Sequence, residues 1–135
     1  MNEWVEIFKD DDLIELRKSF DFHDSLIISV NYKTGNTITK DNSMVMCKTD
    51  CQAIIKLKNQ LGNTIELAFG GVETLKFSGT KKGYFYGLDE DWIEFFSVSG
   101  ERYVCWLCCS EGNFDLTLNG DAEGIIARSL KWRKI

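Results

Sequence analysis

The stretch Asp21-Phe22-His23-Asp24-Ser25-Leu26-Ile27-Ile28-Ser29-Val30-Asn31-Tyr32 decides the fold class. In its second half, apolar residues alternate with the polar Ser29 and Asn31. This alternation is typical of a strand with one buried face, because successive side chains of a strand point to opposite sides of the sheet. We therefore predict a strand that begins at Ser25. Its core face would comprise Leu26, Ile28, Val30 and Tyr32.

Period-two patterns continue after this strand and are separated by turns rich in glycine and asparagine. Residues 51–57 and 65–69 alternate, while residues 103–109 are apolar on both faces, which is typical of a central strand. Residues 114–118 make the last clear alternation, and Glu111-Gly112-Asn113 would join it to its predecessor as a hairpin. Short strands joined in this way predict antiparallel pairing, in a sandwich or in a curved, barrel-like sheet.

The two ends of the chain follow other patterns. Trp4, Ile7 and Phe8 have helical spacing, so residues 1–20 are predicted to be helical, with a break at the acidic run 10–12. Asp12, with Glu15 three residues later, resembles a capping box for a short second helix. At the other end, residues 123–135 fit either a strand or a helix, and a strand is favoured.

These patterns together predict an α+β fold in a single domain, residues 1–135. The helical segment would occupy residues 1–20, and a mainly antiparallel β-rich body would occupy residues 25–135. A chain of 135 residues with 44% hydrophobic residues can bury one core. No internal repeat or linker divides it.

The net charge of −5 restricts the class of partner. Nucleic-acid binding needs a basic face, and the only basic cluster in the sequence is Arg128, Lys131, Arg133 and Lys134, so we expect no nucleic-acid partner. An acidic surface suits solubility or a basic protein partner. No segment approaches the roughly 18 apolar residues of a membrane span, and Met1–Glu6 is unlike a signal peptide. We therefore expect a cytoplasmic protein without membrane contact.

Five cysteines without an export signal are expected to be reduced thiols. Cys105 and Cys108 have loosely the spacing of zinc ligands, as do Cys47 and Cys51. In a strand, however, positions 105 and 108 point to opposite faces and cannot bind one ion. We therefore expect no metal and no cofactor.

Two groups of polar residues are candidate binding sites. The His23-Asp24 pair does not make a complete metal-binding motif, because His23 is the only histidine of the chain. Its favoured role is structural, joining the end of the helix to the first strand by hydrogen bonds, with a binding contact second and catalysis last. Asp89, Glu90 and Asp91 form an acidic run that is either a solvated loop or an epitope for a cationic partner.

Three short motifs carry a resemblance to known proteins. They are Phe22-His23-Asp24-Ser25, the Leu67–Val72 segment with its paired glycines, and the closing Leu130-Lys131-Trp132. With them the chain resembles a group of small bacterial proteins, some of which are similar to immunity proteins of polymorphic toxin systems. The resemblance implies neutralisation of a toxin by protein–protein contact and transfers no catalytic residues.

The leading hypothesis is therefore a non-enzymatic protein-binding module, an immunity protein being the specific form. The first alternative is a small-molecule-binding sandwich or barrel, whose cavity would be lined by aromatic residues. Those residues would be Tyr84, Tyr86, Trp92, Phe95 and Phe96. The second alternative is a hydrolase-like enzyme that uses His23.

Overall fold

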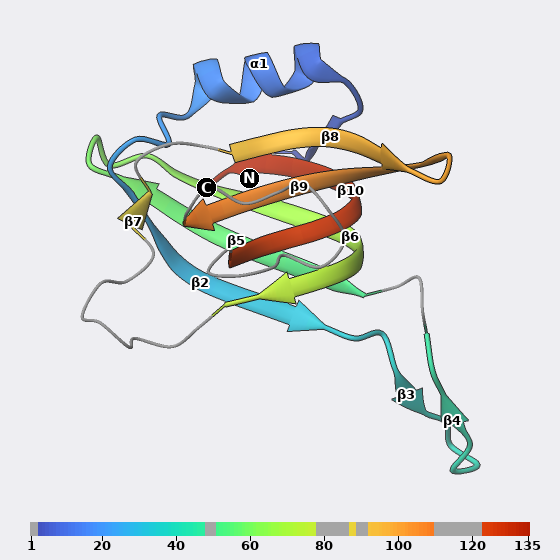
Figure 1. Cartoon of the computed structure of the whole chain (residues 1–135). Helices are drawn as coiled ribbons and strands as arrows, with labels where there is room; N and C mark the ends of the chain where they lie inside the picture. The colour runs from blue at the N-terminus through green and yellow to red at the C-terminus, as the bar shows by residue number, and fades with distance from the viewer. Residues whose placement is uncertain (1–2, 48–50, 78–86, 89–91, 110–122) are drawn as a thin grey trace.

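The computed structural model describes residues 3–47, 51–77, 87–88, 92–109 and 123–135 (Figure 1). Antiparallel strands dominate, and one helix lies near the N-terminus, which confirms the predicted α+β class. The helix is α1 (Asp10–Ser19). The strands are β1 (Val5–Ile7), β2 (Ser25–Lys33), β3 (Thr37–Ile38), β4 (Met44–Val45), β5 (Gln52–Asn59), β6 (Thr64–Lys76), β7 (Gly87–Leu88), β8 (Trp92–Val98), β9 (Glu101–Cys109) and β10 (Glu123–Lys134).

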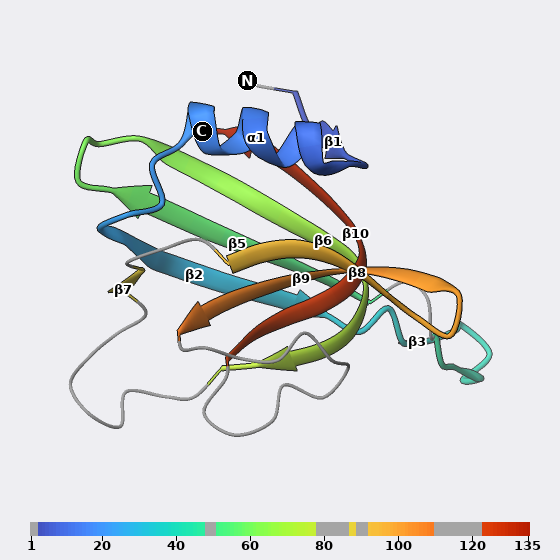
Figure 2. The same ribbon diagram turned by 45° about the horizontal axis from the view of Figure 1, so that its top comes forward.

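In the described part of the chain the strands form one eight-stranded sheet and a separate two-stranded hairpin, β3–β4. The order in the sheet is β7-β2-β5-β6-β10-β9-β8, with β1 added on β10. All of these pairs are antiparallel. The path runs from β7 at one end to β8 at the other, so the sheet is curved and open (Figure 2).

Strand β10 connects the two halves of the sheet. One side of it pairs with β6 along almost its whole length, from Gly124 to Lys134. On the other side its first half pairs with β9, and its second half pairs with β1. The strand predicted for residues 123–135 is therefore confirmed. It pairs with three strands that are far from it in sequence or from one another.

The core lies between the concave side of this sheet and the helix. Leu13 and Leu16 of α1 are buried there, and the Arg17 guanidinium donates a hydrogen bond of 2.9 Å to the Ile93 carbonyl of β8. Full burial of each large apolar side chain contributes about 1.5–3 kcal/mol. The largest fully buried side chains are Trp106, Phe20, Phe69, Leu16, Ile55, Leu57, Ile65, Leu67 and Ile93.

The strand predicted to be central is central. β9 lies between β10 and β8, and Val104, Cys105 and Trp106 are all fully buried. β5 and β6 also follow the predicted alternation, with alternate side chains facing the core. The hairpin predicted around residues 111–118 lies outside the described residues.

The prediction of a helix over residues 3–9 is wrong. Val5 pairs with Trp132, and Ile7 pairs with Leu130, so this segment adds a short strand to the free edge of β10. Three residues are enough for a strand when a partner edge supplies the hydrogen bonds, and sequence patterns alone do not show that edge. The helix begins at Asp10 instead.

The predicted cap of this helix is also shifted. Lys9 occupies the N-cap position, and Asp12 is the third residue of the helix. The Asp12 carboxylate accepts hydrogen bonds from the backbone N–H groups of Phe8 (2.8 Å) and Lys9 (3.1 Å). Asp12 is therefore the N3 residue of a capping box, whose side chain accepts a hydrogen bond from the backbone N–H of the N-cap residue. It is not the N-cap residue itself.

The predicted core face of β2 is wrong as well. The register with β5 shifts at a bulge: Ile27 lies opposite Leu57, but Ser29 lies opposite Lys56. One extra residue moves the following side chains to the other face, so Val30 and Tyr32 lie on the face of Ile55 and Ala53, while Leu26 lies on the opposite face with Lys58. The four residues predicted to be buried are exposed: Leu26, Ile28, Val30 and Tyr32.

Gly71 of β6 lies directly against Arg128 of β10. Its φ is +61°, and a Cβ atom there would lie 2.9 Å from Cγ and 3.0 Å from Cβ of Arg128. The backbone conformation and the close approach of β10 both favour glycine. The bulge or turn predicted at Gly70-Gly71 thus corresponds to a kink inside a continuous strand.

Gly71→Ala should lower the free energy of unfolding by about 2–4 kcal/mol, because it combines left-handed backbone strain with a steric clash. Gly62→Ala is the matched control, since Gly62 also has a positive φ of 88° but no atom near the added methyl group. It should cost only about 1–2 kcal/mol. Urea denaturation measures both values, and equal losses would contradict the close contact with Arg128.

Candidate protein-binding surface

His23 and Asp24 lie in an exposed turn between α1 and β2. The His23 Nδ1 and Asp24 Oδ2 atoms are 2.9 Å apart, and the side chains are 63% and 51% exposed. Asp24 has a positive φ of 56°, and the His23 backbone N–H donates to Asp21 Oδ1 at 3.0 Å. The pair is therefore accessible to a partner, but it is not the buried junction that the sequence predicts.

Asn59, at the end of β5, makes the buried junction instead. It is 5% exposed, and its Nδ2 donates to the Asp21 carbonyl at 3.3 Å. Its Oδ1 accepts hydrogen bonds from the N–H groups of Leu61 (3.1 Å) and Asn63 (3.0 Å). The fully buried Ser25 adds a 2.6 Å bond from its hydroxyl to the Phe22 carbonyl. Sequence analysis missed Asn59 because asparagine next to a glycine turn is typical of an exposed loop.

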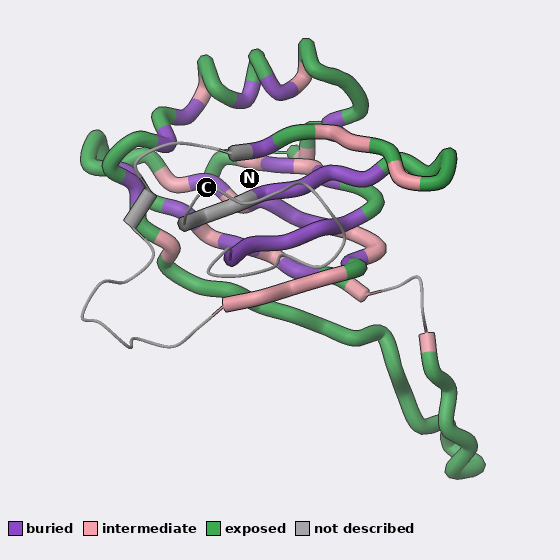
Figure 3. Tube along the Cα trace, in the orientation of Figure 1, coloured by how far each residue is buried: buried purple, intermediate pink, exposed green. Residues whose placement is uncertain are grey.

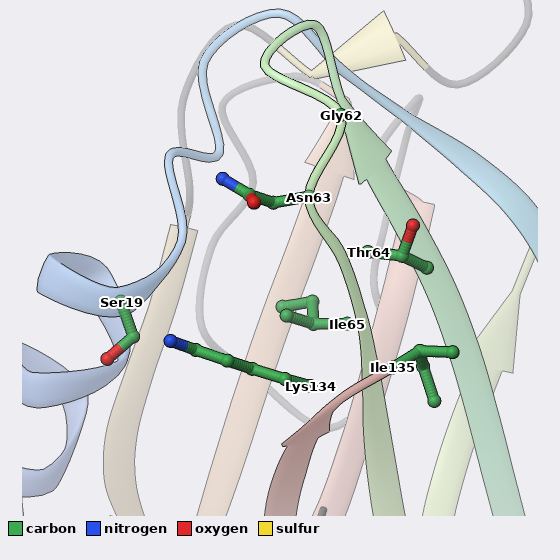
Figure 4. Close-up of a pocket in the computed structure, with 7 residues that line it drawn as sticks. All are labelled: Ser19, Gly62, Asn63, Thr64, Ile65, Lys134 and Ile135. Atoms are coloured by element: carbon green, nitrogen blue, oxygen red, sulfur yellow. The ribbon is translucent and has the colours of Figure 1, made fainter. Parts of the chain in front are cut away.

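One pocket among the described residues is small. A pocket of about 160 Å³ lies between the end of α1, the β5–β6 turn and the end of β10, and Lys134 points into it toward Ser19 (Figure 4). Ligand sites usually have volumes of about 300–1,000 Å³. The pocket is lined by Ser19, Gly62, Asn63, Thr64, Ile65, Lys134 and Ile135, and His23 is not among them.

The aromatic residues proposed to line a cavity contact other side chains where they are described. The Arg102 guanidinium lies 3.8 Å above the Phe95 ring, and Phe96 stacks on Tyr103. Tyr84 and Tyr86 lie outside the described residues, as do Asp89, Glu90 and Asp91.

The described residues also bear on the predictions about metals and thiols. Within the described ranges no three His, Cys, Asp or Glu side chains cluster as metal ligands would. Cys47, Cys51 and Cys105 are free thiols. Nor has any helix there the length and hydropathy of a membrane span.

Exposed apolar side chains are concentrated in one part of the molecule. Of the thirteen large hydrophobic residues that are exposed in the described ranges, eight lie between positions 26 and 46 (Figure 3). We call this set the β2–β4 surface. It comprises Leu26, Ile28, Val30, Tyr32, Ile38, Met44, Val45 and Met46.

The first part of the β2–β4 surface is a free strand edge. β7 pairs with β2 only at Ser25 and Leu26. Beyond that point no described strand pairs with this side of β2, which leaves residues 27–33 as an edge about 20 Å long. Unpaired backbone groups beside exposed apolar side chains form a template for another strand.

The second part is the β3–β4 hairpin, which stands away from the body of the sheet (Figure 1). Ile38 lies opposite Met44, and both side chains are exposed. The tip is closed by a 2.9 Å bond from the Thr39 N–H to the Ser43 carbonyl. The Asp41 carboxylate accepts from the Thr39 hydroxyl and, at 3.2 Å, from the Ser43 N–H. The hairpin thus holds its apolar side chains in a fixed arrangement without support from the core.

These hydrogen bonds lower the pKa of Asp41, the Thr39 hydroxyl being the main cause and Ser43 the next. Near the base of the hairpin, burial raises the pKa of Tyr32, and a hydrogen bond with Cys51 adds to this effect. The Cys51 thiol itself donates to the Thr34 carbonyl at 3.2 Å. Local polar contacts therefore order both ends of the segment that carries the exposed apolar residues.

Comparisons with protein-family models, with curated proteins and with solved structures gave no match to this chain.

The two polar positions of the turn should differ in their effect on stability. Asn59→Ala leaves two backbone N–H groups without their acceptor and should lower the free energy of unfolding by about 1–3 kcal/mol. His23→Ala removes an exposed pair and should cost less than about 1 kcal/mol. Chemical denaturation of both variants tests this. If His23→Ala lowered the free energy of unfolding more than Asn59→Ala, His23 and not Asn59 would be the main structural residue of this turn.

The hairpin tip should depend on pH through Asp41. Because the pKa of Asp41 is lowered in the folded tip, its contribution is complete above the ordinary carboxyl pKa of about 3.9 and is lost as the pH falls through the lowered value. In NMR spectra the Ser43 amide signal should stay constant from neutral pH to about pH 4 and shift below it. Asp41→Asn should abolish that transition. A wild-type signal that does not move in acid would contradict the assignment.

Proposed function

We propose that the chain is a non-enzymatic protein-binding module whose principal contact is the β2–β4 surface. The observation that carries the proposal is that eight exposed large hydrophobic residues lie on β2, whose outer edge beyond Leu26 pairs with no described strand, and on the hairpin segment that follows it. Exposed apolar residues gathered on one segment favour an interaction site.

Strand addition is the mode of binding that this surface favours. A strand of the partner would pair with residues 27–33, where the backbone groups supply affinity. Val30 and Tyr32, which lie opposite Ile55 and Ala53, would supply side-chain contacts on one face. The ordered hairpin would extend the contact beyond the sheet, and its order in advance reduces the entropy that binding costs.

The partner that we propose is a basic toxin, in keeping with the resemblance to immunity proteins. A net charge of −5 attracts a basic protein over distance, and Asp10 and Asp11 are exposed at the start of α1. His23 and Asp24 border the start of β2 and so lie beside the proposed contact. Asp89, Glu90 and Asp91 would add to the acidic attraction. The free thiols suit the cytoplasm, which is the compartment that we propose.

An immunity protein is expected to be encoded beside its toxin, so the test uses the product of the neighbouring gene, produced as an inactive variant, and measures binding by surface plasmon resonance. Ile38→Ser with Met44→Ser removes two apolar side chains of the hairpin and should weaken binding by about tenfold or more. Ile14→Ser with Leu61→Ser is the matched control, because both residues are exposed but lie outside the β2–β4 surface. It should change the affinity by less than about twofold.

The association rate gives a second reading in the same experiment. It should fall as salt is raised, and Asp10→Asn with Asp11→Asn should slow association more than it speeds dissociation. Equal losses in the hairpin and control variants would contradict the proposed contact. A neighbouring gene product that the protein does not bind would contradict the toxin as partner.

A further inference from the structure

The convex face of the sheet, opposite the core, collects side chains from five strands. Paired residues of adjacent strands point to the same face. The register therefore places two rows across this face. One row is Ser29, Lys56, Glu66 and Arg133, and the next is Asn31, Ile54, Ala68, Lys131 and Glu6.

This outer face is basic, although the chain is acidic. Among the paired residues of β1, β2, β5, the first part of β6 and the second half of β10, five cationic side chains lie on this face against two anionic ones, Glu6 and Glu66, which gives this set a net charge of +3. Because the whole chain carries −5, all other residues together carry −8. The five cationic residues are Lys33, Lys56, Lys58, Lys131 and Arg133.

One corner of the outer face is held rigidly. The Arg133 Nε and Nη2 atoms lie 2.8 Å and 2.7 Å from the same oxygen of Glu66. The Arg133 guanidinium also lies 4.3 Å from the centre of the Trp4 ring, and the Lys131 ammonium lies 5.1 Å from it. Two cations over one indole ring form a fixed positive corner, because each is attracted to the face of the ring.

Several cationic side chains of the rest of the outer face are accessible to solvent, although Ala68 is buried and Ile54 is half-buried. α1 packs on the opposite side, where Leu13 and Leu16 enter the core. Among the described elements, no helix or second sheet packs on the outer face. Lys33 and Lys58 are exposed, Lys56 is half-buried, and none of the ion pairs between described residues includes them. Their charge is therefore available to a ligand.

We propose that the outer face is a second binding site, separate from the β2–β4 surface, for an acidic segment of a protein. Charge complementarity selects an anionic ligand, since a face with a net charge of +3 attracts anionic groups and repels cationic ones. The lysines around Ile54 and Ala68 give a small apolar centre with a cationic rim, which suits carboxylate side chains spaced along a polypeptide.

A polypeptide fits this face better than a nucleic acid. Sheets that bind single-stranded nucleic acid present aromatic rings on which bases stack. Here the centre is occupied by Ile54 and Ala68, and the ring of Trp4 is already covered by cations.

Fluorescence anisotropy of the whole chain tests the site with two labelled probes of equal charge: a peptide of alternating glutamate and serine, and a single-stranded oligonucleotide. The peptide should bind more tightly than the oligonucleotide, and raising the salt should weaken its binding. Lys56→Gln with Lys58→Gln should reduce the affinity for the peptide at least about fivefold.

Lys18→Gln with Lys40→Gln is the matched control, because it removes the same charge from exposed positions on α1 and at the hairpin tip. It should change the affinity for the peptide by less than about twofold. Equal losses in the two double variants, or no binding of the peptide, would overturn the proposal. Tighter binding of the oligonucleotide, lost in the Lys56/Lys58 variant, would overturn it in favour of a nucleic-acid site.

Discussion

The pairing of β10 with three other strands is the constraint on which the rest of the structure depends. β6 lies along one side of β10, while β9 and β1 share the other side. Without β10, the strands from β2 to β6 and the β8–β9 pair would have no common sheet. Because β10 comes last in sequence, the sheet is completed by contacts between distant parts of the chain, and such contacts are slow to form in folding.

The edge position of β2 connects this architecture to the proposed function. Leu26 lies on the outer face of the sheet, whereas after the bulge Val30 and Tyr32 lie on the same face as Ile55 and Ala53. All three are exposed, because beyond Leu26 no described strand pairs with the outer edge of β2, and β3–β4 continues the apolar surface away from the body. An edge of this kind favours aggregation unless a partner covers it, which is the physical reason to associate it with binding.

Local patterns predicted much of the fold. β5, β6 and β9 follow from alternation, and each fills the place that its burial pattern indicates. β1 did not follow, because a three-residue strand depends on the edge of β10 and not on its own pattern. The bulge in β2 was also missed, since the extra residue has no sequence signal and reverses every later side chain.

The candidate sites were less predictable than the fold. His23 and Asp24 were recognised as a pair, but the buried polar contacts belong to Asn59, whose role depends on the position of Asp21. The basic outer face combines lysines from β2, β5 and β10, which are far apart in sequence. Only the register of the sheet brings them together, so the charge pattern of the sequence alone showed a single cluster at the C-terminus.

Hydrogen exchange measured by mass spectrometry on the free protein and on its complex with the proposed toxin partner tests the central claim most directly. If a partner strand pairs with the β2 edge, amide exchange should slow in residues 27–33 and in residues 37–46 on binding, because these backbone groups become hydrogen-bonded or covered. Unchanged exchange in both segments, with protection confined to other parts of the sheet, would contradict the account.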